Sequence, residues 1–489
     1  MAADAAAQRR GRGDLTQGPI AKTLLAFALP TLASSILQSL NGTINAIWVG
    51  RFIGEGALAA TSNANMVMFL LTAFVFGFGM AATILVGQAW GRRDIGEARR
   101  VFGTAMGSFA LISILIAIAG YFLSGAILEL LGTPGDAAPL ALAYLRVIFL
   151  AMPALLLLTL AMMALRGGGD SMTPLWFMLV AVLLDSALNP VFILGLGPAP
   201  RLGIAGSATA TLIANYAALL GLFAYIYLKD LPLRLRGKEL RYLWCDVALL
   251  KTIVVKGFPM GLQMVIISLS ALALVGLVNR EGVATTAAFG VAMQLWTYVQ
   301  MPAMALGAAV SAMAAQNIGA GLWDRVGRIT RVGIGQTLVI TAVMILALTL
   351  SDRTVLALFM GGDSPALPIA RHIHLVATWN FLLFGVMMVL FGTVRANGAV
   401  WIPLIVLAIG MVPVRFGYIF ATYGWLGADA IWSSFPVTSA INLALAIGFY
   451  VHGGWRKARM TVGERPSEEE CIEEALATRE PGGALRPAG

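Results

Sequence analysis

The chain of 489 residues is 59% hydrophobic and only 12% charged. Soluble domains carry about 25% charged residues, so this polar surface is too small to solvate a protein of this size, and the composition excludes a soluble enzyme. The net charge of +9 does not indicate a nucleic-acid partner, because the basic residues lie in short loops between apolar runs. Membrane proteins have this pattern.

The first residues, 1–18, are polar, and the apolar run after Lys22 is too long for the core of a signal peptide, so we expect no cleavable leader. A transmembrane helix needs about 20 mainly apolar residues. Twelve such runs follow in chain order, at residues 23–48, 57–88, 101–125, 138–164, 174–197, 204–228, 252–279, 284–316, 331–350, 368–394, 401–422 and 428–451. The pattern predicts an all-α polytopic membrane protein with twelve transmembrane helices.

Basic residues are concentrated in every second connection between these runs. The basic connections carry Arg92, Arg93, Arg99 and Arg100, then Lys229, Arg234, Arg236, Lys238 and Arg241, and then Arg325, Arg328 and Arg331. The intervening connections carry little more than Arg51, Arg201, Arg280 and Arg353. The positive-inside rule places the basic connections in the cytoplasm. We therefore expect a multi-pass protein of the inner (plasma) membrane with both termini inside.

The end of the chain, residues 455–489, is polar and contains an acidic run from Glu468 to Glu470. We expect a cytosolic, disordered tail with room for a short helix. The two cysteines, Cys245 and Cys471, fall in segments predicted to be cytoplasmic, so no disulfide is expected.

The two halves of the chain resemble each other at a nearly constant offset. The matching pairs are Pro30 and Pro259, Gly79 and Gly307, Gln88 and Gln316, Gly91 and Gly319, Arg166 and Arg395, and Pro174 and Pro403. We expect two six-helix bundles, at residues 19–228 and 251–454, joined by a basic cytoplasmic linker at 229–250. A pseudo-twofold axis along the membrane normal should relate the bundles, with a substrate site between them. A duplicated channel is the alternative, but neither half has a pore-like filter sequence.

A series of short motifs runs through both halves. The first half contains "LTQGPIAKTLLAFALP", "NAIWVGRFIGEGALAA", "GQAWGRRDIGEARR", "ALRGGGDSMTP", "LNPVFI" and "GIAGSATAT", and the second contains "GFPMGLQ" and "AAQNIGAG". In this order they resemble the multidrug and toxic compound extrusion (MATE) transporters of the MOP flippase superfamily. The resemblance covers residues 15–455 and is closer to DinF-like than to NorM-like members.

The resemblance implies a V-shaped pair of bundles that exports small amphipathic, often cationic, organic compounds by alternating access. The driving force would be the inward flow of protons or sodium ions. The partners would be these substrates and the lipid bilayer. We also expect a monomer with no enzymatic activity, and no cofactor or metal beyond the coupling ion.

Ionisable side chains inside a bilayer are costly, so each one is a functional candidate. We expect two to lie deep in the spans, Asp185 in the fifth and Arg415 in the eleventh. Asp185 and Asn189 share one helix face, just before a break expected at Pro190. A buried carboxylate can bind and release a proton near neutral pH, because desolvation disfavours its charged form. An Asp held only for packing by Asn and backbone hydrogen bonds is the alternative.

The first span places Gln38, Asn41 and Asn45 on one helix face, at spacings of three and four residues. Many DinF-like members carry Asp where this chain has Asn45. An amide cannot titrate, so Asp185 must supply the charge of any ion site in the first bundle.

Three further positions follow from the resemblance. Tyr144 and Thr211 match family positions that line the same cavity, with ordinary helix contacts as the alternative. Pro30 in the first span is the expected point of helix bending.

The second half lacks the acidic residue that NorM-like members place in the seventh span, because no Asp or Glu follows Gln263 until Glu281. Arg415 resembles a family arginine, and we expect it to anchor helices through carbonyl groups or Asn380. One alternative function is a flippase of lipid-linked saccharides. Such flippases line the central cavity with several arginines, whereas the first, second, seventh and eighth spans of this chain have no interior Arg. The others are an exporter of an endogenous metabolite and a membrane-embedded enzyme, although the sequence shows no His, Asp or Glu cluster for catalysis.

Overall fold

A computed structural model describes residues 13–53, 55–130, 138–197, 200–244, 246–361 and 364–460, except for the side chains of 55–66 and 358. These residues contain eleven helices long and apolar enough to cross a membrane, and twelve when one bent pair is counted as a single span. The predicted all-α polytopic fold with twelve transmembrane helices is confirmed. The two cysteines and the tail beyond residue 460 lie outside the described residues.

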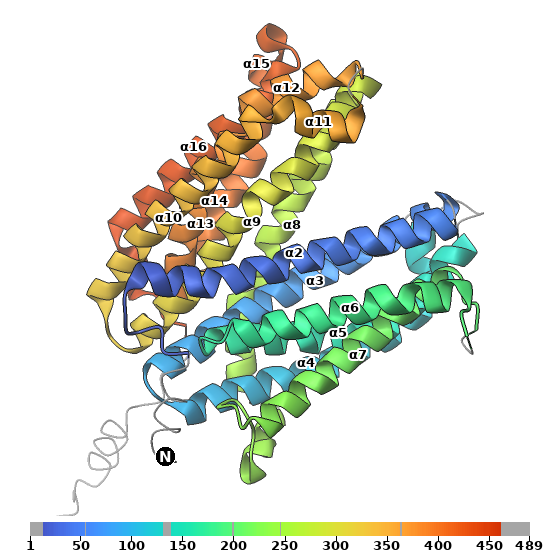
Figure 1. Cartoon of the computed structure of the whole chain (residues 1–489). Coiled ribbons are helices and arrows are strands. Elements are labelled where there is room, and N and C mark those ends of the chain that lie inside the picture. The colour runs from blue at the N-terminus through green and yellow to red at the C-terminus, as the bar shows by residue number, and fades with distance from the viewer. Residues whose placement is uncertain are drawn as a thin grey trace, which may run out of the picture.

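The helices form two groups that diverge from a shared end (Figure 1). The first bundle consists of α2 (Ile20–Phe52), α3 (Glu55–Gly91), α4 (Ile95–Leu130), α5 (Ala138–Gly167), α6 (Met172–Leu194) and α7 (Ile204–Leu228). The second consists of α8 (Val247–Val278), α9 (Val283–Gly319), α10 (Trp323–Leu350), α11 (Asp352–Met360), α12 (Ala366–Ala377), α13 (Asn380–Ala396), α14 (Trp401–Ile409), α15 (Arg415–Leu426) and α16 (Asp429–His452). Short helical turns are η1 (Gly237–Leu243), η2 (Asn279–Glu281), η3 (Gly410–Val414) and η4 (Gly454–Lys457).

Two predicted spans of the second bundle are interrupted. The tenth bends by 44° between α12 and α13, where the Thr378 hydroxyl accepts a hydrogen bond from the Trp296 indole at 2.9 Å. The eleventh contains the π-helical turn η3 between α14 and α15. Pro413 lies in this turn, and a proline cannot donate to the helical ladder, so a shift of the hydrogen-bond pattern is expected there.

The two bundles meet at a pseudo-symmetric contact, which we call the seam: Gln88 and Gly91 of α3 with Gln316 and Gly319 of α9. The Gln88 amide donates to the carbonyl of Ala396 at 2.7 Å, and the Gln316 amide donates to the carbonyl of Gly167 at 3.0 Å. A Cβ atom at Gly91 would collide with the Gln316 carbonyl, and one at Gly319 with the Gln88 carbonyl. Each half therefore uses the same two residue types to contact the other, as the repeat predicts.

The segment 13–18, which we assigned to the N-terminal tail, packs across this seam. Leu15 is only 5% exposed, its N–H donates to the Gln316 side chain at 2.9 Å, and its carbonyl accepts from Asn317 at 3.1 Å. Gly13 lies against Gly168 and Gly169 at the end of α5. The segment thus ties the start of the first bundle to the end of α9 in the second.

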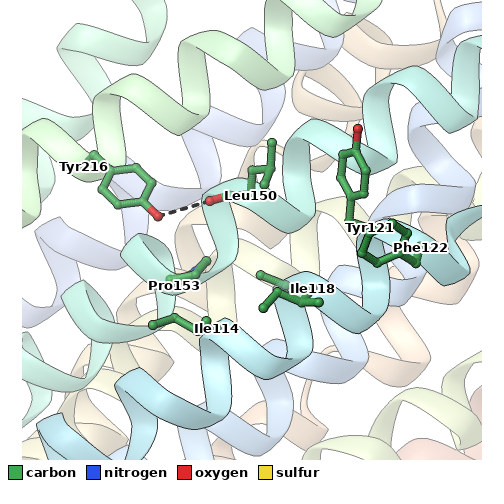
Figure 2. Close-up of a pocket in the computed structure, with 8 residues that line it drawn as sticks. Ile114, Ile118, Tyr121, Phe122, Leu150, Pro153 and Tyr216 are labelled. Carbon is green, nitrogen blue, oxygen red and sulfur yellow. Dashed lines mark hydrogen bonds between the residues drawn. The ribbon is translucent and has the colours of Figure 1, made fainter.

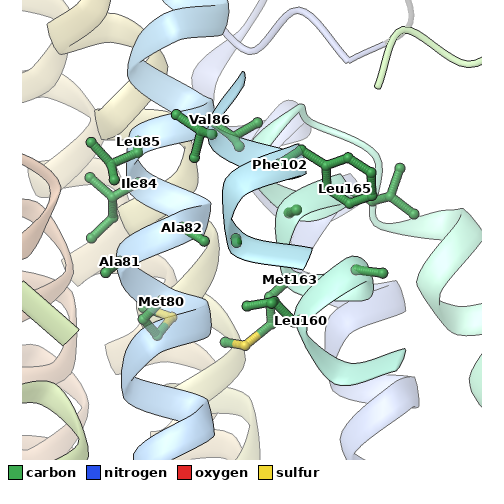
Figure 3. Packing of buried hydrophobic residues seen from close by; sticks show 14 of the residues in the cluster. Met80, Ala81, Ala82, Ile84, Leu85, Val86, Phe102, Leu160, Met163 and Leu165 are labelled. Atoms are coloured by element: carbon green, nitrogen blue, oxygen red, sulfur yellow. The ribbon is translucent and has the colours of Figure 1, made fainter. Parts of the chain in front are cut away.

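The hydrophobic core beside the seam is rich in alanine and methionine. Figure 3 shows the run from Met80 to Val86 of α3 packed beside Phe102 of α4 and Leu160 and Met163 of α5. Ala314 and Ala315 of α9 belong to the same cluster. Because small residues let helix backbones approach closely, the two bundles share one continuous core at this end.

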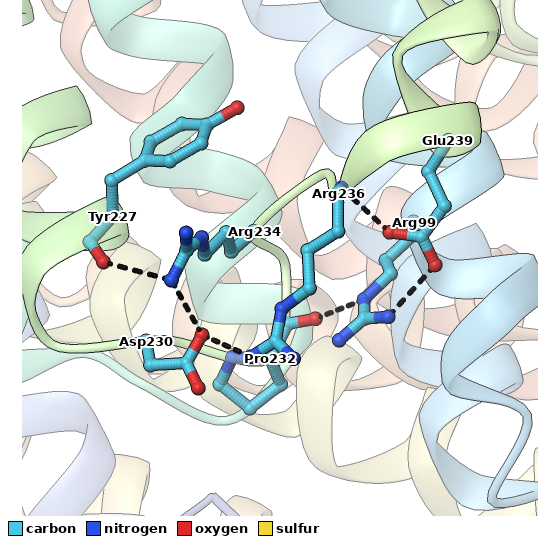
Figure 4. Close-up of polar contacts among 7 residues, drawn as sticks. All are labelled: Arg99, Tyr227, Asp230, Pro232, Arg234, Arg236 and Glu239. Carbon is cyan, nitrogen blue, oxygen red and sulfur yellow. Dashed lines mark hydrogen bonds and ion pairs between the residues drawn. The ribbon is translucent and has the colours of Figure 1, made fainter.

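The basic linker folds against α4. Arg99 donates to the carbonyl of Pro232 at 2.7 Å and pairs with Glu239 of η1 at 2.8 Å (Figure 4). Asp230 pairs with both Arg234 and Arg236, and the hydrogen bond from Arg236 lowers the pKa of Asp230. The ends of α3 and α9 that form the seam therefore lie on the same face of the molecule as the connections rich in Arg and Lys. We call this face the basic face.

Candidate functional site

The polar residues of α6 lie one helical turn apart in the middle of the first bundle. Asp185 is 2% exposed and Asn189 is fully buried. The break expected at Pro190 is wrong, because α6 continues through it to Leu194. Membrane helices tolerate an internal proline where side chains satisfy nearby backbone groups. Pro190 leaves the carbonyl of Ser186 without its helical donor, and the Asn189 amide bonds the adjacent carbonyl, that of Asp185, at 2.8 Å.

Four neutral side chains from three helices donate to the Asp185 carboxylate. Asn41 and Asn45 of α2 donate to Oδ2 at 2.8 and 2.9 Å. Thr211 of α7 and Asn189 donate to Oδ1 at 3.1 and 3.2 Å. The structure therefore brings together five of the residues that the sequence singled out, and the carboxylate is the point where α2, α6 and α7 meet.

Two further amide hydrogen bonds lie beside these donors. The Asn189 amide also donates to Asn45 Oδ1 at 2.8 Å, which links α6 back to α2. Asn215, one turn after Thr211 on α7, donates to the Thr211 carbonyl at 2.8 Å. Asn215 was missed at the sequence level, although its spacing of four residues from Thr211 could have indicated it.

The charge of this site is not balanced by a basic side chain. Within the described part of the chain, Asp185 makes no ion pair with Lys, Arg or His. Two buried acceptors beside it, Asn41 Oδ1 and Asn189 Oδ1, have no hydrogen-bond partner. A buried anion with spare oxygen acceptors around it has room for a proton or a hard cation, since both bind to oxygen atoms.

The structure does not bring every predicted site residue to Asp185. Gln38 is exposed and makes no hydrogen bond to a described residue. Tyr144 of α5 is buried in an apolar cluster with Val49 and Val75, within electrostatic range of Asp185 but without a hydrogen bond to it. Gln38 and Tyr144 therefore flank the hydrogen-bonded cluster without belonging to it.

Pro30 is buried in α2, and the helix runs unbroken past it from Ile20 to Phe52. The ring removes the N–H that would bond the carbonyl one turn earlier. Two hydroxyl groups bond carbonyls around this gap, Ser34 to Pro30 at 2.9 Å and Thr31 to Phe27 at 3.1 Å. Bending at Pro30 stays a prediction, because α2 is continuous here.

The charged residues of the spans differ from the expectation. Arg415 contacts neither Asn380 nor a carbonyl group: it donates to the Ser270 hydroxyl at 3.4 Å and lies 4.7 Å from the ring centre of Phe435. Besides the two residues expected to lie deep in the spans, Arg146 lies within a predicted span, in the first third of α5. Its position within a predicted span could have revealed it.

The described residues contain no group of three or more His, Cys, Asp or Glu side chains that could hold a metal ion. Asp185 and its four neutral donors form the site of the first bundle in which buried polar side chains from three helices meet.

Comparisons with known proteins bear on this arrangement. The family model described as MatE matches residues 30–191 and again residues 259–420, which are equal stretches of the two halves. This chain belongs to the MatE (MATE) family. The double match agrees with the internal repeat read from the sequence. The distinction between DinF-like and NorM-like members is not made by these matches.

Relatives and solved structures of MATE proteins cover nearly the whole chain. The "Probable multidrug resistance protein YoeA" of Bacillus subtilis (strain 168) is 36% identical over 442 residues, which are 90% of this chain and 95% of that protein. Crystal structures titled "MATE in the bent conformation" and "MATE in the straight conformation" match with TM-scores of 0.82 and 0.81 at 20% identity. They cover 91% of this chain and 97% and 98% of those chains, and they show that the MATE fold is shared.

Proposed function

We propose that this MATE protein is a multidrug efflux transporter that exports amphipathic or cationic organic compounds in exchange for protons, with sodium as the alternative coupling ion. The basic face would lie in the cytoplasm of a cell whose inner membrane holds the protein. Support comes from the name of the Bacillus relative, a probable multidrug resistance protein that matches 90% of the chain.

The observation that carries the proposal is the unpaired Asp185 carboxylate. It is buried, it receives hydrogen bonds from neutral groups alone, and it lies on the contact between α2, α6 and α7. An ionisable group in such a place is costly unless its charge is used. A proton or a cation at Asp185 would neutralise it, and release of that ion would restore the negative charge.

Neutralisation also changes which groups bond α2. The deprotonated carboxylate accepts from Asn41 and Asn45 through Oδ2. A protonated carboxyl group donates one hydrogen bond, and Asn41 Oδ1 is an acceptor without a partner. Binding of a proton therefore exchanges an acceptor for a donor at the contact that holds α2. Pro30 lies on the same helix and removes one of its backbone hydrogen bonds. The change of hydrogen bonding at Asp185 can therefore bend α2 at Pro30.

The test is transport by the full-length protein in proteoliposomes, with a cationic dye as cargo and with proton and sodium gradients imposed separately. Asp185→Asn keeps the shape of the side chain but fixes it in a neutral form. We expect the proton-driven rate to fall by at least about tenfold, equivalent to about 1.4 kcal/mol. A sodium gradient that drives the wild type as well as a proton gradient does would identify sodium as the coupling ion.

Asp429→Asn is the matched control, because Asp429 is an exposed carboxylate paired with His372 at the start of α16. It should transport at the wild-type rate. Equal rates for wild type and Asp185→Asn under both gradients would remove Asp185 from the mechanism.

A further inference from the structure

A groove of about 520 Å³ lies on the first bundle between α4, α5 and α7 (Figure 2). Its lining has no charged side chain and includes Ile118 and Phe122 of α4 and Leu150 of α5. Its two hydroxyl groups belong to Tyr121 and Tyr216, and the Tyr216 hydroxyl is engaged by the Leu150 carbonyl at 3.2 Å. The groove therefore offers an apolar surface with little hydrogen-bonding capacity.

The groove opens toward the surrounding membrane. The second bundle packs mainly against α2 and α3, whereas α4 and α7 both pack against α5 on the side where the groove lies. Phe122 is 76% exposed and Ile118 is 52% exposed. Exposed side chains of this kind in a membrane span contact lipid, and a concave apolar strip between helices fits an acyl chain.

The positively charged side chain of Arg146 lies beside the groove. Arg146 of α5 lies one turn before Leu150 on the same helix face, and its guanidinium carbon is 5.3 Å from the ring centre of Tyr121. Arg146 is exposed, and within the described residues it has no hydrogen bond and no ion pair. An exposed arginine inside a membrane helix that makes no ion pair has no counter-charge from the described residues.

The depth of Arg146 fits the headgroup region of a lipid. With a rise of 1.5 Å per residue, α5 is about 45 Å long and Arg146 lies about 12 Å from its start at Ala138. The hydrocarbon core is about 30 Å thick, so a centred α5 places the Arg146 backbone about 5 Å inside its edge. The long side chain can reach the interface from there. This end of α5 is opposite to the seam and the basic face.

We propose that the groove binds one phospholipid, with its phosphodiester on Arg146 and one acyl chain along Tyr121, Phe122 and Leu150. The phosphate supplies the missing counter-charge, and the chain covers the apolar strip. A cationic organic compound does not fit this place, because Arg146 would repel it. The lipid site is thus separate from Asp185. The proposal of a lipid site does not depend on the transport proposal.

The experiment is a titration of the purified full-length protein in detergent with palmitoyl-oleoyl phosphatidylglycerol, followed by native mass spectrometry. We expect Arg146→Ala to weaken the tightest bound lipid by about fivefold. Arg353→Ala is its control, since Arg353 is exposed in the second bundle at α11 and lines no part of the groove. Ile118→Trp should weaken the same lipid by filling the groove. Its control, Leu115→Trp, alters an exposed residue of α4 outside the groove.

Two further ligands distinguish the contribution of the phosphate from that of the acyl chains. Dioleoylglycerol lacks the phosphate and should bind more weakly than phosphatidylglycerol, and inorganic phosphate alone should not displace the lipid. Wild-type affinity in both Arg146→Ala and Ile118→Trp would overturn the proposal. So would equal binding of dioleoylglycerol, or displacement of the lipid by inorganic phosphate, which would indicate a simple anion site.

Discussion

The two bundles place opposite charges at corresponding points of the repeat. In the first, Asp185 of α6 is bonded by Asn41 of α2 at 2.8 Å. In the second, Arg415 at the start of α15 bonds Ser270 of α8 at 3.4 Å. Asn41 and Ser270 occupy the same position of the two family matches, and Arg415 lies one residue beyond the counterpart of Asp185. A π-helical turn accommodates one extra residue, and η3 ends directly before Arg415.

The side chains that contact the two charges from α7 and from α16 also lie at corresponding positions. Gly203 before α7 and Gly427 before α16 have nearly the same backbone angles, φ 57° and ψ −127° against φ 56° and ψ −134°. Counted from these glycines, Thr211, which donates to the carboxylate, matches Phe435, whose ring faces the guanidinium. Each bundle thus surrounds its charge with groups suited to that sign. The duplicated scaffold does not require the same charge in both halves, and the acidic side chain belongs to the first.

The largest expected effect is a difference in proton-driven efflux between variants of Asp185 and of Arg415. Arg415→Gln removes the cation but keeps a donor for Ser270, so proton-driven efflux should stay within about threefold of the wild type, below 1 kcal/mol. The loss at Asp185→Asn should be at least tenfold, equivalent to about 1.4 kcal/mol. Both variants are compared in the same proteoliposomes at equal protein content. A loss as large for Arg415→Gln as for Asp185→Asn would break the comparison.

A second prediction sharpens the comparison at the seam, where the halves are alike in residue type but not in contacts. Among the described residues, the Gln316 side chain bonds Leu15, Gly13 and Gly167, whereas the Gln88 side chain bonds Ala396 alone. Gln316→Ala should destabilise the protein by about 1–3 kcal/mol, because it leaves buried backbone groups without partners. Thermal unfolding followed by tryptophan fluorescence measures this. Gln88→Ala is the matched variant, and a larger loss there would contradict the assignment.

A third, smaller effect concerns the groups that surround each charge. Thr211→Val keeps the volume but removes one donor to Asp185, worth about 1 kcal/mol, so efflux should fall by about fivefold. Phe435→Leu removes the ring beside Arg415 and should lower thermal stability by about 0.5–2 kcal/mol while leaving the coupling intact. Reversed outcomes in the transport and unfolding assays would place the functional charge in the second bundle.

The smallest effect lies in the linker, which has no counterpart in the repeat. Burial acts to raise the pKa of Asp246, but the hydrogen bond and charge of Arg100 and the hydrogen bonds from the backbone N–H groups of Leu249 and Ala248 together outweigh it and hold the pKa below the ordinary value of 3.8. A lowered carboxylate pKa stabilises the folded linker above pH 3.8, and this contribution is lost as the pH falls through the folded-state pKa. The protection factors for hydrogen exchange of residues 229–244, which compare the rate with that of an unfolded chain at the same pH, should therefore fall below about pH 3.8. Asp246→Asn should show the lower protection already at neutral pH, and unchanged protection in this variant would argue against the contact.

Much of the fold follows from local patterns. Apolar runs, alternating loop charge and a constant offset between halves predict helices, their number and their pairing, because a bilayer permits few other solutions. Helical spacing predicts that Asp185 and Asn189 share one helix face and that Asn41 and Asn45 share another, whereas a common cavity for the two pairs is implied by the family resemblance alone. By contrast, the packing of Leu15 against Gln316 joins positions three hundred residues apart, and no local pattern reports it.

The errors have physical reasons as well. Pro190 predicts a break for a helix in water, whereas a bundle of membrane helices tolerates an internal proline, and α6 continues to Leu194. Gln38 shares a face with Asn41, but a helix face is broad, and packing alone decides which part of it meets α6. Arg146 escaped attention because one charge hardly changes the hydropathy of a long apolar run.

The position of Leu15 bears on how the protein can be handled. To separate the bundles at the basic face, this leucine must leave its pocket and Gln316 must give up both of its bonds to the leading segment. A bulky fusion placed ahead of residue 13 would be anchored at that joint and would bias the measured rates. Attachment of purification tags or fluorophores at the opposite terminus leaves the joint free.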